Sequence, residues 1–146
     1  MHSRSIPSHV PSSQDHVSSS QSPTAPQKGM FITFEGIDGA GKTTQAKRLA
    51  QWLRQQNVKV VETHEPYHSD QTEAICNGLN MDHEKHHWSP LTRTLLYFTL
   101  RHEHVIRCIC PALEKGEWVI CDRFTDRTMA YQGYGQGLDR NIIAAL

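Results

Sequence analysis

A glycine-rich segment early in the chain places the strongest limit on its fold. Residues 36–43 read Gly-Ile-Asp-Gly-Ala-Gly-Lys-Thr and match G-x-x-x-x-G-K-[ST] at every position. A short apolar run, residues 30–35, precedes this segment, and helical spacing of apolar side chains follows over residues 42–56. A strand, a glycine-rich turn and a helix in this order predict a loop whose backbone amides bind phosphate groups.

The residue types of this loop explain how it would bind a nucleoside triphosphate. Glycines let the backbone approach the phosphates, and the helix N-terminus adds partial positive charge. Lys42 is expected to reach the β- and γ-phosphates of ATP, and the Thr43 hydroxyl to bind Mg²⁺. The expected phosphate-binding residues are Gly36, Gly39, Ala40, Gly41, Lys42, Thr43 and Thr44. The motif alone is compatible with motors, GTPases and small-molecule kinases.

Alternating strands and helices predict the fold class. Residues 30–35, 58–62 and 117–121 are apolar, β-rich runs that read as strands. Because helical segments separate them, we predict an α/β fold of the P-loop NTPase class with a doubly wound parallel sheet. Helices are expected over residues 42–56, 70–79, 90–109 and 139–146, with Leu91, Leu95 and Leu96 on an apolar face of the long one and Pro111 kinking or ending it.

Composition bounds the other properties of the chain. Residues 1–28 hold nine serines and four prolines, so we predict a disordered tail there and a folded domain over residues 29–146. Fifteen basic and fifteen acidic residues leave no basic excess, which argues against a nucleic-acid or membrane surface. Cys76, Cys108, Cys110 and Cys121 form no C-x-x-C pair. Reduced cysteines favour a cytoplasmic location.

The end of the third expected strand carries a second candidate motif, Cys121-Asp122-Arg123-Phe124. Ligands of open parallel sheets bind at the carboxyl ends of strands. Asp122 there is suited to orient Mg²⁺ through water, and Arg123 to bind a second phosphate in a bidentate manner. Taken alone, this Asp-Arg pair is equally compatible with a surface ion pair.

Together, four segments resemble the thymidylate kinase family over residues 31–145. They are Phe34-Glu35 with the loop through Gln45, the long-helix stretch from Leu95 to Val105, Cys121–Phe124, and Ala130–Gly133 followed by Gly135–Asp139. Their order and spacings are those of the family. The resemblance implies a nucleoside monophosphate kinase-like fold and transfer of the γ-phosphoryl of ATP to dTMP, giving dTDP.

The resemblance also implies roles for individual residues. The expected catalytic residues are Lys42, Asp38, Arg123 and Asp122, with Mg²⁺ held by Thr43 and Asp122. Arg123 would bind the dTMP phosphate, and Asp38 would face the 3′-hydroxyl. Tyr97 would stack on thymine, and Arg101 would donate to a base carbonyl. Tyr131 would crowd the 2′ position of a ribonucleotide. The expected dTMP-binding residues are Asp38, His64, Tyr97, Arg101, Arg123, Thr128, Tyr131 and Gln132.

The sequence departs from the family after the second strand. His64 stands where the family has Arg, and Tyr67 and His68 stand where it has two glycines. Because histidine is only partly charged near neutral pH, acceptor binding is expected to strengthen as the pH falls. Gln136 also replaces a common Arg. These changes keep a related P-loop kinase of another nucleotide open as an alternative.

The family further implies a C-terminal lid, two more strands and a homodimer of the full-length protein. We expect the lid and the last strands to be missing from these 146 residues. A fragment that binds nucleotide without turnover is therefore a second alternative. Residues 83–87 match H-E-x-x-H, but their polar neighbours predict a solvated loop rather than a zinc site.

Overall fold

Three parallel strands form the sheet of the computed structural model, which describes residues 29–80 and 88–146. They are β1 (Phe31–Phe34), β2 (Val60–His64) and β3 (Trp118–Asp122), in the order β1-β3-β2. In the register, Asp122 pairs with both Phe34 and His64. All three strands therefore end at the same edge of the sheet, where the two candidate motifs lie.

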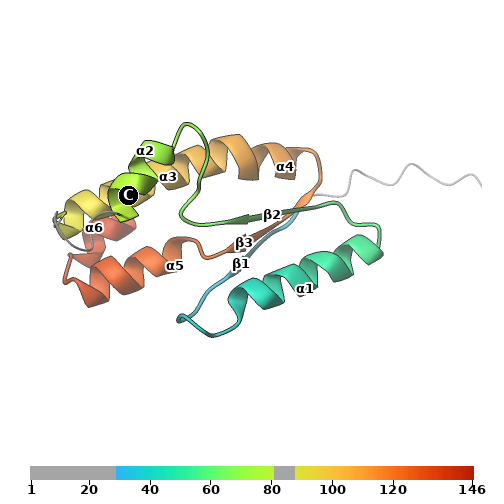
Figure 1. Cartoon of the computed structure of the whole chain (residues 1–146), viewed down its shortest axis with the longest axis horizontal. Coiled ribbons are helices and arrows are strands. Elements are labelled where there is room, and N and C mark those ends of the chain that lie inside the picture. The colour runs from blue at the N-terminus through green and yellow to red at the C-terminus, as the bar shows by residue number, and fades with distance from the viewer. Residues whose placement is uncertain (1–28, 81–87) are drawn as a thin grey trace, which may run out of the picture.

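Helices cover both faces of this sheet (Figure 1). Helix α1 (Lys42–Gln55) lies on one side, and α3 (Pro90–His104) continues on the other through η2 (Val105–Ile109) into α4 (Cys110–Glu114). Helix α2 (Glu73–Asn80) packs on α3. After β3 come α5 (Thr125–Thr128), η3 (Met129–Gly135) and α6 (Arg140–Ala145). The predicted parallel α/β arrangement is confirmed.

The central strand explains why both helical layers pack so closely. Successive side chains of a strand point to opposite faces. Ile120 packs with Ala50 and Leu53 of α1. On the opposite face, Val119 packs with Ile109 of η2 and Ala112 of α4. Because both residues are at most 1% exposed, β3 is buried on both faces, as its apolar sequence predicts.

Pro111 was expected to kink or end the long helix. The helix does not end there, because α4 continues to Glu114. The N–H of Cys110 donates to the carbonyl of Val105, which is one residue further back than in an α-helix. This π turn places Pro111, which has no N–H to donate, at the start of α4. The hydrogen-bond register therefore changes at the point where proline would interrupt it.

Two further boundaries differ from the sequence predictions. The short helix begins at Glu73 rather than at residue 70, because Ser69 and Thr72 form a side-chain turn in which the Ser69 N–H donates to Thr72 Oγ1 at 2.8 Å. Residues 125–135 are helical, although no helix was predicted there. The second strand lies two residues later than predicted, which puts His64 in the strand. The tail 1–28 and the H-E-x-x-H segment lie outside the described residues.

Candidate nucleotide-binding site

The glycine-rich loop has the backbone that its sequence predicts. Gly39 and Gly41 have φ angles of 81° and 83°, a conformation that side chains with a Cβ rarely adopt. Gly41 is the N-cap of α1, so the free N–H groups at the start of this helix open into the loop. Lys42 Nζ donates to the carbonyl of Ile37 at 2.8 Å. The Lys42 side chain thus folds back onto the loop that precedes it.

A cavity of about 310 Å³ lies over this loop. It brings together five of the seven predicted phosphate-binding residues, all except Gly36 and Ala40, and the motif at the end of β3. The lining residues are Asp38, Gly39, Gly41, Lys42, Thr43, Thr44, Asp122 and Arg123. Backbone amides, a lysine and an arginine around one cavity form an environment suited to polyphosphate.

Thr43 and Asp122 meet at the floor of this site. The Thr43 hydroxyl donates to Asp122 Oδ2. The second carboxylate oxygen, Oδ1, is buried and has no hydrogen-bond partner among the residues that the structure describes. A buried carboxylate oxygen without a partner costs free energy unless a ligand satisfies it. A hydroxyl beside a carboxylate is the type of oxygen donor set that suits Mg²⁺.

Arg123 is held in a strained backbone conformation. Its φ angle is 72°, which is uncommon for a residue other than glycine. The Arg123 N–H donates to the Phe34 carbonyl at 3.0 Å, and the Cys121 thiol donates to the Arg123 carbonyl at 2.9 Å. Burial raises the pKa of this thiol, which keeps it a donor. Such strain persists where the surroundings hold it, and this turn directs the side chain to Asp38, with which it forms an ion pair.

Arg101 lies in the interior and is only 6% exposed. Its Nη2 donates to Glu65 Oε2 at 2.7 Å and to Thr128 Oγ1 at 2.9 Å, and its Nε donates to Glu65 Oε1 at 2.9 Å. Its remaining nitrogen, Nη1, is buried without a partner among the described residues. The predicted acceptor residues Arg101 and Thr128 are thus in contact, and one guanidinium nitrogen, Nη1, keeps its N–H donors unpaired.

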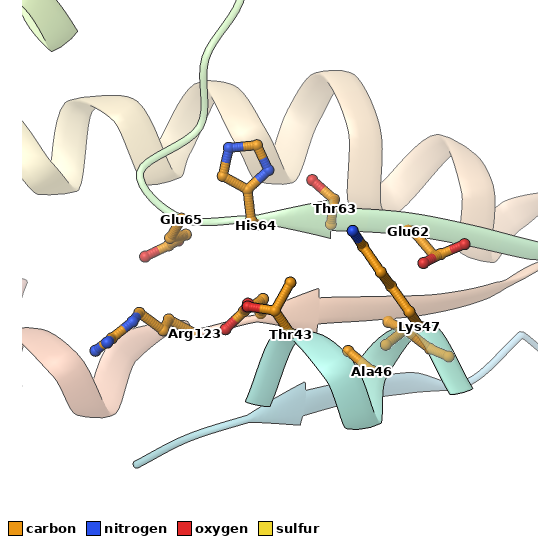
Figure 2. A pocket seen from close by; sticks show the side chains of 10 residues that line it. Thr43, Ala46, Lys47, Glu62, Thr63, His64, Glu65 and Arg123 are labelled. Carbon is orange, nitrogen blue, oxygen red and sulfur yellow. The ribbon is translucent and has the colours of Figure 1, made fainter. Parts of the chain in front are cut away.

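The other predicted acceptor residues are placed in three different ways. The rings of Tyr97 and Tyr131 both contact the Arg127 guanidinium. Gln132 is buried, with 4% of its surface exposed. His64 is exposed at the end of β2 and lines a cavity of about 410 Å³ together with Thr43, Lys47 and Arg123. Figure 2 shows that the His64 and Arg123 side chains point in different directions from this cavity.

Sequence reasoning missed three charged residues at this site. Glu65 pairs with Arg101, and Arg127 lies between the two tyrosines. Glu35 accepts the N–H of Phe124 at 2.6 Å and so joins the end of β1 to the turn after β3. Burial raises the pKa of the Glu35 carboxyl, while the hydrogen bond from Phe124 acts against that shift. Each of these roles depends on a contact between distant segments.

Comparison with known proteins identifies the family that has this site. The family model described as thymidylate kinase matches residues 34–146. This chain belongs to the thymidylate kinase family. Thymidylate kinases of Geobacter sulfurreducens and of a Janthinobacterium species are 49% and 50% identical to it over 118 residues, which is 81% of this chain and 55% and 56% of theirs. The chain therefore spans about half the length of these relatives.

A solved thymidylate kinase supports the same assignment of the fold. The crystal structure of the enzyme from Ehrlichia chaffeensis matches 81% of this chain with a TM-score of 0.73 and 44% sequence identity. The match covers 66% of the Ehrlichia chaffeensis chain. The predicted P-loop NTPase class is thus confirmed for this thymidylate kinase family member.

The described ranges lack two other features. Residues 29–80 and 88–146 contain no group of three or more His, Cys, Asp or Glu side chains able to hold a metal ion. They also contain no helix long and apolar enough to cross a bilayer.

Proposed function

We propose that this site transfers the γ-phosphoryl group of ATP to dTMP and releases ADP and dTDP. One observation carries the proposal: the phosphate-binding loop and Arg123, a candidate for the acceptor phosphate, line the same cavity. In the reaction, a phosphate oxygen of dTMP forms a bond to the γ-phosphorus. The bond from that phosphorus to the bridging oxygen of ADP breaks. Catalysis of this kind relies on positioning and on charge stabilisation rather than on covalent chemistry by the protein.

The donor half of the proposal uses the loop and the first turn of α1. Lys42 would release the carbonyl of Ile37 and bind the β- and γ-phosphates, which are stronger acceptors than a peptide carbonyl. The amides of residues 39–44 would donate to the same oxygens. Thr43 and Asp122 would hold Mg²⁺, directly and through water respectively. The metal would neutralise charge on the phosphates.

The acceptor half uses residues from three elements. Arg123 is paired with Asp38 in the absence of ligand, so the dTMP phosphate would exchange that partner for its own oxygens. Asp38, which is largely exposed, is then free to accept from the 3′-hydroxyl. Tyr97 would stack on thymine, and Arg101 would donate its unpaired Nη1 to a base carbonyl. Thr128, Tyr131 and Gln132 would complete the pocket.

Two properties of the assembled protein follow from the same family membership. We propose that two copies pair through α3 and the adjoining η2, because Leu91 and Leu95 of α3 and Ile106 of η2 are 41%, 46% and 46% exposed and recur at whole-turn spacing. A cytoplasmic location agrees with the four free cysteines of the described residues.

The test is a coupled assay of ADP release by the 146-residue chain with ATP, Mg²⁺ and dTMP, beside calorimetric titration with each nucleotide. We expect dTMP to bind and to be preferred over other nucleoside monophosphates. Lys42→Met should abolish transfer, whereas Lys115→Met, at the far end of α4, should leave it unchanged. Binding of ATP without binding of dTMP would overturn the assignment of the acceptor. Binding of both without turnover would mean that this chain lacks a catalytic part.

A further inference from the structure

Arg127 occupies the space between two aromatic rings of the candidate acceptor site. Its Cζ lies 5.3 Å from the ring centroid of Tyr97 and 5.4 Å from that of Tyr131. Both distances are within the range of a cation–π contact. The rings belong to α3 and η3, and Arg127 belongs to α5. A cation is thus held where three elements meet, at a position that no sequence motif identifies.

The hydrogen-bonding capacity of Arg127 is incomplete. Its Nε is buried and has no hydrogen-bond partner among the described residues. Guanidinium groups carry donors only, and a buried donor without an acceptor costs free energy. Arg127 also lines a cavity of about 390 Å³ with Gly36, Arg123 and Tyr131. Arg127 therefore borders a space that extends from Tyr131 to the phosphate-binding loop.

Resting on the proposed function, we propose that Arg127 is a specificity-determining residue that donates to a carbonyl oxygen of the acceptor base. The buried, unpaired Nη1 of Arg101 offers a second donor. Thymine presents two carbonyl oxygens, whereas cytosine presents one carbonyl and an amino group, which is itself a donor. A guanidinium donor at the position of the second carbonyl favours the pyrimidine that has an acceptor there. A guanidinium donor that faces the amino group of cytosine finds no acceptor, and this selects against dCMP.

Calorimetric titration of the 146-residue chain with dTMP and with dCMP tests this inference. Arg127→Ala should weaken dTMP binding about tenfold or more, since a hydrogen bond from a charged group is lost, and should weaken dCMP binding less. Arg127→Lys should recover only part of the affinity, because ammonium lacks the planar fork. Arg140→Ala is the matched control. Its guanidinium lies 4.7 Å from the Tyr134 ring on an exposed part of α6, so both affinities should stay unchanged.

The possible outcomes separate this inference from the proposed function. An unchanged affinity of Arg127→Ala for dTMP would overturn the inference alone, and so would tighter binding, which would mean that Arg127 blocks the pocket. Equal losses for dTMP and dCMP would overturn its role in specificity. If the unsubstituted chain binds ATP but not dTMP, the proposed function fails first and the inference fails with it. Thermal unfolding of each variant distinguishes lost binding from lost structure, and Arg127→Lys supplies the comparison where alanine unfolds the chain.

Discussion

Glu65 accepts more hydrogen bonds from Arg101 than any other described residue does. Both carboxylate oxygens accept from Arg101, and the two side chains are 6% and 7% exposed. Removing one partner of a buried ion pair leaves an uncompensated charge. Glu65→Gln should therefore lower the free energy of unfolding by about 3–5 kcal/mol in urea titration. It should also weaken dTMP binding, because Arg101 loses its position.

An exposed pair in the same sheet supplies the control for this prediction. Glu62 of β2 pairs with Arg54 of α1, and their side chains are 34% and 48% exposed. Solvent screens such pairs, so Glu62→Gln should cost less than about 1 kcal/mol. Similar losses in the two variants would contradict the view that Glu65 compensates a buried charge.

Glu35 predicts a dependence of stability on pH. Burial raises the pKa of its carboxyl above the ordinary value of 4.5. A carboxyl whose pKa is higher in the folded state binds its proton more tightly there. Its contribution to stability is thus fully present below the ordinary value and is lost as the pH rises through the folded-state pKa. Glu35→Gln does not ionise, so its stability relative to the unsubstituted chain should increase from acidic to neutral pH.

Urea titration of both proteins across this pH range measures the difference directly. Other titrating groups cancel in the comparison, because they are common to the two proteins. A difference in the free energy of unfolding that stays constant with pH would show that Glu35 ionises alike in the folded and unfolded chains.

The candidate site illustrates how far single residues can be predicted from sequence. Lys42, Thr43, Asp122 and Arg123 lie in contiguous motifs, and the structure brings them to one cavity. Glu65 and Arg127 have no such local signal. Their partners are far away in the sequence or on another helix, so only the folded chain defines their roles.

Helix α1 shows that apolar periodicity can identify the face that packs on a sheet. Ala46, Ala50 and Leu53 recur at helical spacing and pack on Ile120. Leu53→Ala should lower the free energy of unfolding by about 2–5 kcal/mol, because it removes buried contacts and leaves a cavity. Trp52→Ala is the matched control: this neighbouring side chain is 56% exposed, so its loss should cost far less in urea titration. Equal losses would place the packing face elsewhere.

Helix α3 shows the limit of the same reasoning. Its leucines suggested an apolar face, yet Leu91 and Leu95 are exposed, whereas Thr94, Arg101 and His104 are buried. These polar side chains are buried because they have partners: Thr94 Oγ1 donates to the Pro90 carbonyl at 2.8 Å, and His104 Nε2 lies 2.7 Å from Thr63 Oγ1. Periodicity records hydrophobicity and does not record hydrogen bonds. The helix over residues 125–135 was missed for a related reason, since polar residues and glycines interrupt its apolar pattern.

The parallel sheet makes the molecule's topology predictable although several boundaries are not. Alternation of strands with helices determines that the strand ends meet at one edge, and the sequence alone therefore predicts that the loop and Arg123 lie together. The strand register, the π turns and the left-handed backbone of Arg123 are not visible in the apolar pattern of the sequence. The chemistry was therefore predictable at the strand ends and much less so on the helices that surround them.

The exposed leucines of α3 become understandable when a second copy is considered. Leu91 and Leu95 of α3 and Ile106 of η2 form an apolar stripe on the side away from the buried residues of α3. Isolated exposed leucines need no explanation, but a stripe along one helix is typical of an interface. Because a twofold axis would place the stripe against itself, a charge at Leu95 would meet its own copy. Leu95→Glu should therefore shift the chain from dimer to monomer in sedimentation velocity at micromolar concentration.

A second glutamate substitution distinguishes this interface from a general effect of charge. Gln51 is exposed on α1, which covers the opposite face of the sheet, so Gln51→Glu adds the same charge away from the stripe. It should leave the dimer intact. A monomer in the unsubstituted chain, or a dimer that tolerates Leu95→Glu, would mean that two copies do not pair through α3. The packing of Thr94, Arg101 and His104 on the other side of this helix would then hold the acceptor site without help from a partner.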